Sequence, residues 1–165
     1  MLNPTAAQLL RAIETTLVNV VEPEVTSTSA RSALATIGHL LRHAVLRIED
    51  GEALLMADSA ACSTLLDRLA AYYRDAGDAP QAEAIGEKLK TESAISPRTA
   101  LSERVAVLRG AVQEVLIDLQ EKRTARGHDA AYQVARADIR EYLRGQLEQE
   151  AALIHPAFAD KGPRR

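Results

Sequence analysis

The segment ARSALATIGHLLRHAVLRIEDGEAL, residues 30–54, decides the fold class of this chain. At 100° per residue its main apolar stripe consists of Ala30, Leu34, Ile37, Leu41, Val45 and Ile48. Leu40 and Leu46 flank the opposite side, so the segment is apolar on more than one side. This pattern predicts a long helix that has two faces to cover, one of them against a partner chain.

Two histidines, His39 and His43, lie four residues apart on that helix, a spacing that can chelate zinc or iron. A zinc site needs at least three protein ligands, so His128, His155 or acidic residues would have to join them. A metal-dependent bundle enzyme that uses His39 and His43 is therefore the alternative hypothesis. The main interpretation is a histidine pair that is exposed or faces a partner.

The candidate partner face combines cationic and histidine side chains with one leucine. Its members are Arg31, His39, Arg42, His43, Leu46 and Arg47. Gly38 lies in the middle of the same helix, where glycine costs about 1 kcal/mol relative to alanine. It indicates either a tolerated defect or a close approach of another helix.

Composition favours a small helical domain. The chain has 165 residues and 17.9 kDa, which suits one domain, predicted over residues 1–156 with a mobile tail at 157–165. Hydrophobic residues make up 47% and aromatic residues only 3%, so the core must consist of aliphatic side chains and alanine. Alanine-rich, aromatic-poor sequences favour helices packed closely on helices.

The charge balance and the lone cysteine exclude several classes of protein. A net charge of −3 gives no long-range attraction to phosphate backbones, so no nucleic-acid partner is expected. Cys62 alone cannot form an internal disulfide and suits a reducing compartment. No stretch reaches the roughly 20 apolar residues of a membrane span. We expect a cytoplasmic protein without a membrane partner.

The remaining helices are predicted from caps and breaks. Asn3 and Pro4 begin the first helix and Pro23 stops it. Asp50-Gly51 breaks the second, and Asp58 is the N-cap of the third. A short, peripheral fourth helix begins near Asp78 and ends near Lys90.

Two further helices complete the predicted fold. A fifth, from about Pro97 to Arg126, has the heptad seam Leu101, Val105, Leu108, Val112, Val115 and Leu119. Asp129 caps a sixth that ends at Pro156. These elements predict an all-α antiparallel bundle of four to five long helices plus one short helix.

No catalytic constellation is evident from the residues. Cys62 lies on an apolar helix face with no histidine nearby, which is typical of an inert buried thiol. Gln146 and Glu150 project near the apolar face of the last helix and need partners inside, which leaves a small-molecule cavity as a third option. No catalytic residue and no cofactor are predicted.

Four segments of the N-terminal half carry a resemblance. They are NPTAAQLLRAI at residues 3–13, ARS at 30–32, LLRHAVLRIE at 40–49 and EALL at 52–55. Mainly over residues 3–66, they resemble an uncharacterised family of bacterial helical proteins encoded near acyl-CoA dehydrogenases and kinases similar to aminoglycoside phosphotransferases. The resemblance implies a pathway neighbourhood and no activity. The expected function is thus a non-catalytic accessory or interaction bundle, a homodimer with a dehydrogenase or kinase as further partner.

Overall fold

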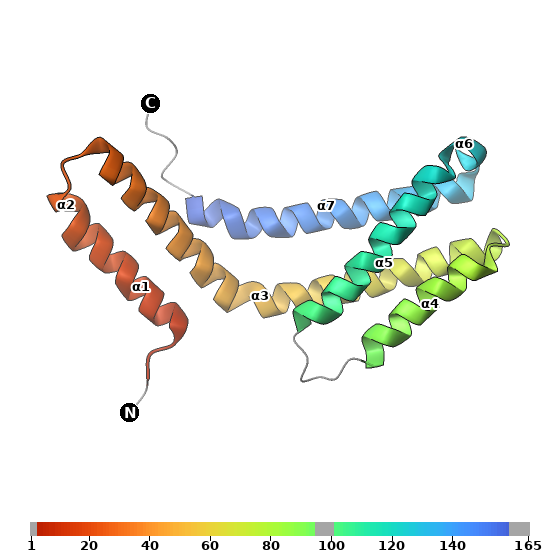
Figure 1. Ribbon diagram of the computed structural model, residues 1–165, viewed down its shortest axis with the longest axis horizontal. Helices are drawn as coiled ribbons and strands as arrows, with labels where there is room; N and C mark the ends of the chain where they lie inside the picture. Colours follow the sequence, from red (N-terminus) through yellow and green to blue (C-terminus); the bar gives the residue numbers. More distant parts are fainter. Residues whose placement is uncertain (1–2, 95–100, 159–165) are drawn as a thin grey trace. The chain divides into compact units, whose positions relative to one another are not determined.

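The computed structural model describes residues 3–94 and 101–158, and every regular element in these ranges is helical. The longer helices are α1 (Ala6–Thr16), α3 (Thr28–Asp75), α4 (Ala79–Ala94), α5 (Leu101–Glu121) and α7 (Ala130–Phe158). Between them lie a π-helical turn η1 (Leu17–Val21) and the short α2 (Glu22–Glu24) and α6 (Arg123–Arg126) (Figure 1). The prediction of an all-α bundle with four to five long helices is confirmed.

The start of α1 differs from the prediction by two residues. Thr5 is the N-cap, and its hydroxyl accepts the Gln8 backbone N–H at 3.2 Å. The Gln8 side chain in turn accepts the Thr5 backbone N–H at 2.9 Å. This reciprocal capping box satisfies two otherwise unpaired donors, so the helix begins at Ala6 and the Asn3-Pro4 start is wrong.

Pro23 does not end the first helical segment, as the sequence had suggested. The helix passes through η1 and continues in α2 to Glu24, with Pro23 inside α2. In η1 the Glu22 N–H donates to the Leu17 carbonyl, five residues back. This wider turn relieves the clash that a proline ring makes with the carbonyl four residues before it in a regular α-helix.

The predicted break at Asp50-Gly51 is also wrong, because α3 runs without interruption from Thr28 to Asp75 (Figure 1). A helical glycine costs about 1 kcal/mol, which neighbouring turns can offset, and no proline reinforces it here. Asp58 therefore lies in the middle of a helix and caps nothing.

The chain divides into two compact units. Unit 1 comprises Met1–Glu52 with Glu148–Arg165, and unit 2 comprises Ala53–Leu147. Helices α3 and α7 each contribute to both units. The single domain predicted over residues 1–156 stays a prediction, and the predicted tail lies outside the described residues from position 159 onward.

Unit 2 holds a continuous apolar core between the second half of α3, α4, α5 and the first part of α7. Its buried members are Cys62, Leu65, Leu66, Leu69, Ala70, Tyr73, Ala82, Ile85, Leu108, Ala111, Val112, Val115, Leu119, Tyr132, Ala135 and Ile139. Five of the six predicted heptad positions of α5 are buried; the first, Leu101, is half-buried. The seam prediction is confirmed, because spacings of three and four residues keep these side chains on one face.

The ends of the remaining helices test the other predicted caps. Asp78 accepts the Gln81 backbone N–H at 3.4 Å and Asp129 accepts that of Ala131 at 2.9 Å, so both start α4 and α7 as expected. Pro156 does not end α7, which continues to Phe158. The predicted start at Pro97 lies outside the described residues. Of the helices described, none is long and apolar enough to cross a bilayer.

Candidate functional site

The predicted partner face begins with three polar residues in the first half of α3. Arg31 donates to the Val25 carbonyl at 2.7 Å. His39 is buried, and its Nδ1 lies 2.8 Å from Nη2 of Arg42. Arg42 also pairs with Glu14 of α1 at 3.4 Å. These side chains therefore contact their own chain and connect α3 with the segment that precedes it.

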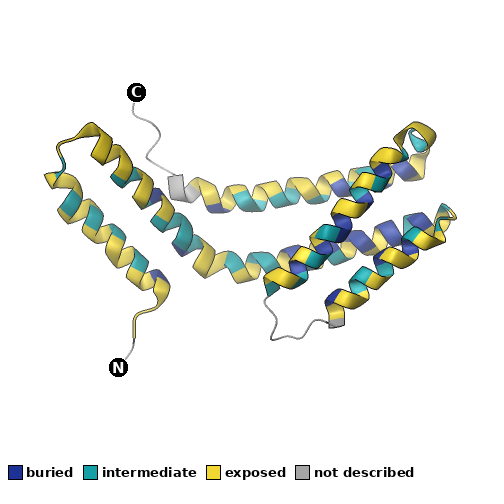
Figure 2. Cartoon of the chain, in the orientation of Figure 1, coloured by how far each residue is buried: buried dark blue, intermediate teal, exposed yellow. Residues whose placement is uncertain are grey.

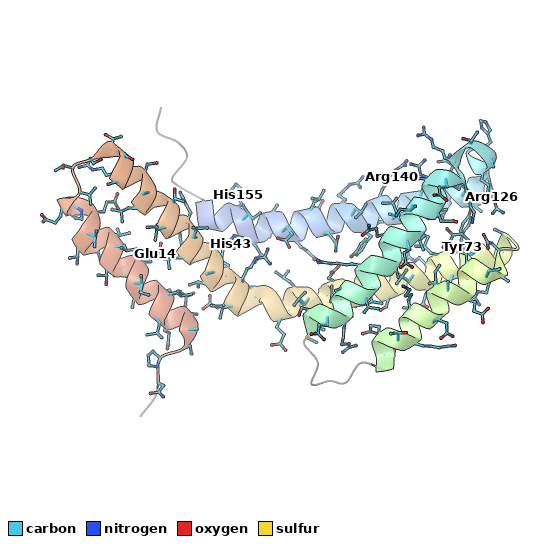
Figure 3. All side chains as sticks on the ribbon, viewed as in Figure 1. Glu14, His43, Tyr73, Arg126, Arg140 and His155 are labelled. Carbon is cyan, nitrogen blue, oxygen red and sulfur yellow. The ribbon has the colours of Figure 1, made fainter. Side chains whose placement is uncertain are left out.

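The other two polar members of that face lie on the α7 side of α3. Arg47 donates from Nε to Nε2 of His43 at 2.9 Å and from Nη2 to Glu150 at 2.9 Å. In Figure 3, Glu14 of α1 and His43 of α3 lie on opposite sides of α3, with His43 on the side of the end of α7. Leu46 is half-buried. Within unit 1, α3 is thus flanked by α1 and by the end of α7, and polar contacts hold both to it.

Among the residues that the structure describes, the histidine pair has no third ligand of the kind a metal site would need. In the described ranges 3–94 and 101–158, no three His, Cys, Asp or Glu side chains are grouped so that they could hold a metal ion. His43 instead accepts from Arg47, and His39 lies against Arg42. The geometry gives no support to the metal-dependent alternative.

A shallow hollow lies between α1 with its π turn and α3. It is lined by Glu14, Leu17, Val18, Glu22, Leu34, Ala35, Gly38 and Arg42. Its interior space of about 10 Å³ suits a single water molecule and no metabolite. A Cβ placed on Gly38 would have no neighbour within 4 Å. Within the described chain, Gly38 is therefore not a site of close helix approach.

Unit 1 leaves many large apolar side chains in contact with solvent (Figure 2). On α1, η1 and the first half of α3 these are Leu9, Ile13, Val18, Val20, Ile37, Leu40 and Ile48. Leu40 is the most exposed of them, at 63%. Monomeric proteins rarely expose large contiguous apolar patches, so this surface is the strongest candidate for an interaction site.

Unit 2 contains a buried polar cluster that joins α3, α5 and α7. Asp58 is only 3% exposed, and its Oδ1 accepts from the Tyr142 hydroxyl and the Gln146 amide, each at 2.9 Å. Its Oδ2 accepts from Arg109 Nε at 2.8 Å and Nη2 at 2.7 Å. Four donors from two other helices therefore saturate this carboxylate, which makes a buried charge tolerable.

The Cys62 thiol completes the cluster. Its sulfur lies 2.8 Å from the Tyr142 oxygen and 3.9 Å from Oδ1 of Asp58. Burial raises the pKa of Cys62 from 9.0 to about 11, against the lowering effect of the Tyr142 hydrogen bond. Burial, followed by the hydrogen bonds with Cys62 and Asp58, also raises the pKa of Tyr142. The predicted burial of Cys62 is confirmed, and a raised pKa favours the protonated thiol over the nucleophilic thiolate.

Arg109 carries the positive charge that balances Asp58. Burial acts to lower its pKa, but the charge and hydrogen bond of Asp58 outweigh that effect and raise it. With Gln146 satisfied by Asp58 and Glu150 paired with Arg47, both polar positions predicted on α7 have protein partners. The arrangement ties α3, α5 and α7 together through one buried carboxylate.

A second polar cluster ties the other ends of the unit 2 helices together. The Tyr73 hydroxyl donates to Asp118 at 2.5 Å, and Lys122 bridges Asp118 at 2.8 Å and Asp78 at 2.7 Å. The hydrogen bond from Lys122 is the main cause that lowers the pKa of Asp78. This cluster holds the start of α4 against the end of α5.

The fold and these contacts define an all-α helical protein whose polar clusters are engaged internally. No protein-family model, curated protein or solved structure matches the chain. The resemblance of residues 3–66 to a family encoded near acyl-CoA dehydrogenases and kinases therefore stays a prediction.

Proposed function

We propose that this protein is a non-catalytic accessory or interaction protein and that unit 1 supplies its docking surface. The main support for this proposal is that the two units differ in how many apolar side chains they bury. Both units expose some large apolar side chains, but unit 2 also buries a continuous core. The described part of unit 1 has no comparable core, and leucine and isoleucine side chains along its α1 and α3 are exposed. A surface of that kind gains free energy when a protein partner covers it.

The polar residues support a binding role over a catalytic one. Asp58, the most deeply buried carboxylate described, is saturated by Arg109, Tyr142 and Gln146. A general base needs an acceptor that can reach a substrate proton. The hollow beside Gly38 has space for about one water molecule and so cannot hold a substrate.

The proposed assembly is a homodimer that uses the exposed apolar side of α3 and serves acyl-CoA dehydrogenase or kinase pathway enzymes. Support for the homodimer comes from the exposure of Ile37, Leu40 and Ile48. Support for the enzyme partners comes only from the family resemblance of the N-terminal half.

Direct binding to purified enzymes tests this function. The full chain is mixed with an acyl-CoA dehydrogenase and, in a separate sample, with a kinase of the kind encoded near members of the resembling family. Each mixture is analysed by size-exclusion chromatography with light scattering. We expect co-elution with one of the two enzymes. A chain that co-elutes with neither enzyme contradicts the accessory role.

A further inference from the structure

Two apolar stripes, one on α1 and one on α3, lie on the same side of unit 1. On α1 the stripe contains Leu9, Ala12, Ile13 and Thr16, and the exposed Val20 follows in η1. On α3 it contains Ala33, Ile37, Leu40, Ala44 and Ile48. Except for Ala44, which is half-buried, all of these side chains are exposed.

The direction of each stripe follows from the contacts between the two helices. Arg11 pairs with Glu49 at 2.6 Å and Glu14 with Arg42 at 3.4 Å, so α1 and α3 are antiparallel. The facing sides are marked by half-buried Leu10 and Leu17 on α1 and by Leu34 and buried Val45 on α3.

On a helical wheel with 100° per residue, the centre of each exposed stripe lies about 90–110° from the side of its helix that faces the other helix. The rotation from the facing side to the stripe has the same sense in both helices. In an antiparallel pair, equal rotation in the same sense brings both stripes to one side. The end of α7 contacts α3 through Arg47, at the edge of the α3 stripe. It leaves the stripe open to solvent, since Leu40 is 63% and Ile48 51% exposed. The two stripes therefore form one two-helix face.

None of the residues named in the two stripes is charged, and Arg47 at the edge of the α3 stripe is paired with Glu150. Arg11, Glu14, Arg42 and Glu49 lie at the junction of α1 and α3, where they pair with one another. The only polar atom of the α1 stripe, the Thr16 hydroxyl, donates to the Ala12 carbonyl at 2.9 Å. A symmetric interface brings identical residues together near its two-fold axis, so an uncharged face suits a second copy of the same chain.

The apolar area approaches what a stable dimer requires. A standard interface buries about 800 Å² per partner, of which about 60% is apolar. A fully buried leucine or isoleucine side chain accounts for roughly 100 Å² of apolar surface, and the six large side chains of the face are each about half exposed, which gives about 300 Å². The alanine and threonine methyl groups between them add further apolar surface area.

We propose that the face formed by Leu9, Ile13, Val20, Ile37, Leu40 and Ile48 binds the same face of a second copy. Two α1–α3 hairpins then pack into an intermolecular four-helix bundle, whose core is made of these side chains. This inference deepens the proposed homodimer by placing α1 beside α3 in the interface. It rests on the proposed interaction role but not on any enzyme partner.

Charge placed on the face tests the assembly. Light scattering on the full chain should give a mass of twice 17.9 kDa. Ile13→Glu and Ile48→Glu should each weaken self-association at least about tenfold, because a carboxylate would be buried without a partner. Ile117→Glu is the matched control: Ile117 is 48% exposed, close to the 49% of Ile13, but lies on α5 in unit 2. Its self-association should match the unmodified chain.

Circular dichroism on each variant shows whether the helices remain folded. Cross-linking gives an independent measurement: single cysteines at Leu9, Ile13, Leu40 and Ile48 are oxidised one at a time, and at least one should link two copies covalently. A cysteine at Val134, 61% exposed on α7 in unit 2, should not. Cys62 is fully buried and stays out of the reaction.

The outcomes separate this inference from the proposed function. A chain that remains monomeric at about 100 μM, or a dimer that Ile13→Glu and Ile48→Glu leave intact, overturns the second-copy interface. A monomer that uses this face for another protein overturns it as well. A dimer that binds neither enzyme contradicts the accessory role and supports the interface. A monomer that binds one of the enzymes supports the accessory role and contradicts the interface.

Discussion

Unit 1 and unit 2 differ in what they do with the same kinds of residue. Unit 2 buries leucine, valine and tyrosine side chains between four helical segments and saturates a buried aspartate with hydrogen bonds. In the described part of unit 1 the buried apolar side chains are only Ala7, Val45 and Leu153. Unit 2 therefore has a core that stabilises it, whereas the described part of unit 1 leaves most of its large apolar side chains exposed.

The largest expected effect comes from cutting the unit 2 core. Leu66 is fully buried on α3, and Leu66→Ala should lower the free energy of unfolding by about 4 kcal/mol through lost burial and a cavity. The matched change on the same helix in unit 1 is Leu40→Ala, at a side chain that is 63% exposed. Urea unfolding at low protein concentration should show a change within about 0.5 kcal/mol for Leu40→Ala. Equal losses at both positions would show that unit 1 has a core of its own.

Asp58→Ala sharpens the contrast by removing the centre of the polar cluster. The donors of Tyr142, Gln146 and Arg109 would lose their acceptor, so we expect a loss of about 3 kcal/mol in urea unfolding. The control is Asp67→Ala, an exposed aspartate on the same helix, which should change stability by less than about 0.5 kcal/mol. A small effect at both positions would mean that the cluster does not orient the helices.

Asp58 also shows where prediction from sequence stops. An aspartate that precedes an apolar run looks like an N-cap, and the local sequence is the same whether its carboxylate caps a helix or is buried. Its partners Arg109 and Tyr142 are 51 and 84 residues away in the chain, so no local pattern identifies them. Gln146 is the one signal in the sequence, since its position near the apolar face of the last helix predicts a polar group that needs an internal partner.

The elements that were predicted correctly depend on local spacing. The seam of α5 repeats every three or four residues, and burial follows that repeat. Breaks were predicted less well: Gly51, Pro23 and Pro156 all lie inside helices. Their cost of about 1–3 kcal/mol each is small enough for packing and a π turn to offset.

Alkaline pH should weaken unit 2 through Cys62. The folded-state pKa is about 11 and the ordinary value is 9.0, so below pH 9 the thiol is protonated in both states and its contribution is fully present. Between pH 9 and 11 the unfolded chain releases the proton while the folded chain retains it, and stability falls by up to about 2 kcal/mol. The raised pKa of Tyr142 acts in the same direction at higher pH.

Urea midpoints at pH 8, 9, 10 and 11 measure this effect, with Cys62→Ala as the control. The variant should lose stability less steeply over this range than the unmodified chain, because its unfolded state has no thiol to ionise. Parallel pH profiles for the two proteins would contradict the role assigned to burial of Cys62.

The smallest expected effect is a gain of stability in unit 1. Gly38 lies within α3 beside the hollow, and a Cβ there would meet no atom within 4 Å. Gly38→Ala should therefore raise the free energy of unfolding by about 1 kcal/mol, which is the helix preference of alanine over glycine. Urea unfolding measures this gain in the free energy of unfolding. The control is Gly145→Ala, at a helical glycine of α7 where a Cβ would also meet no atom within 4 Å. Because Gly38 faces α1 and not the proposed dimer face, the gain should be independent of protein concentration. A loss that grows with concentration would place a second copy against Gly38 and move the interface to that side of α3.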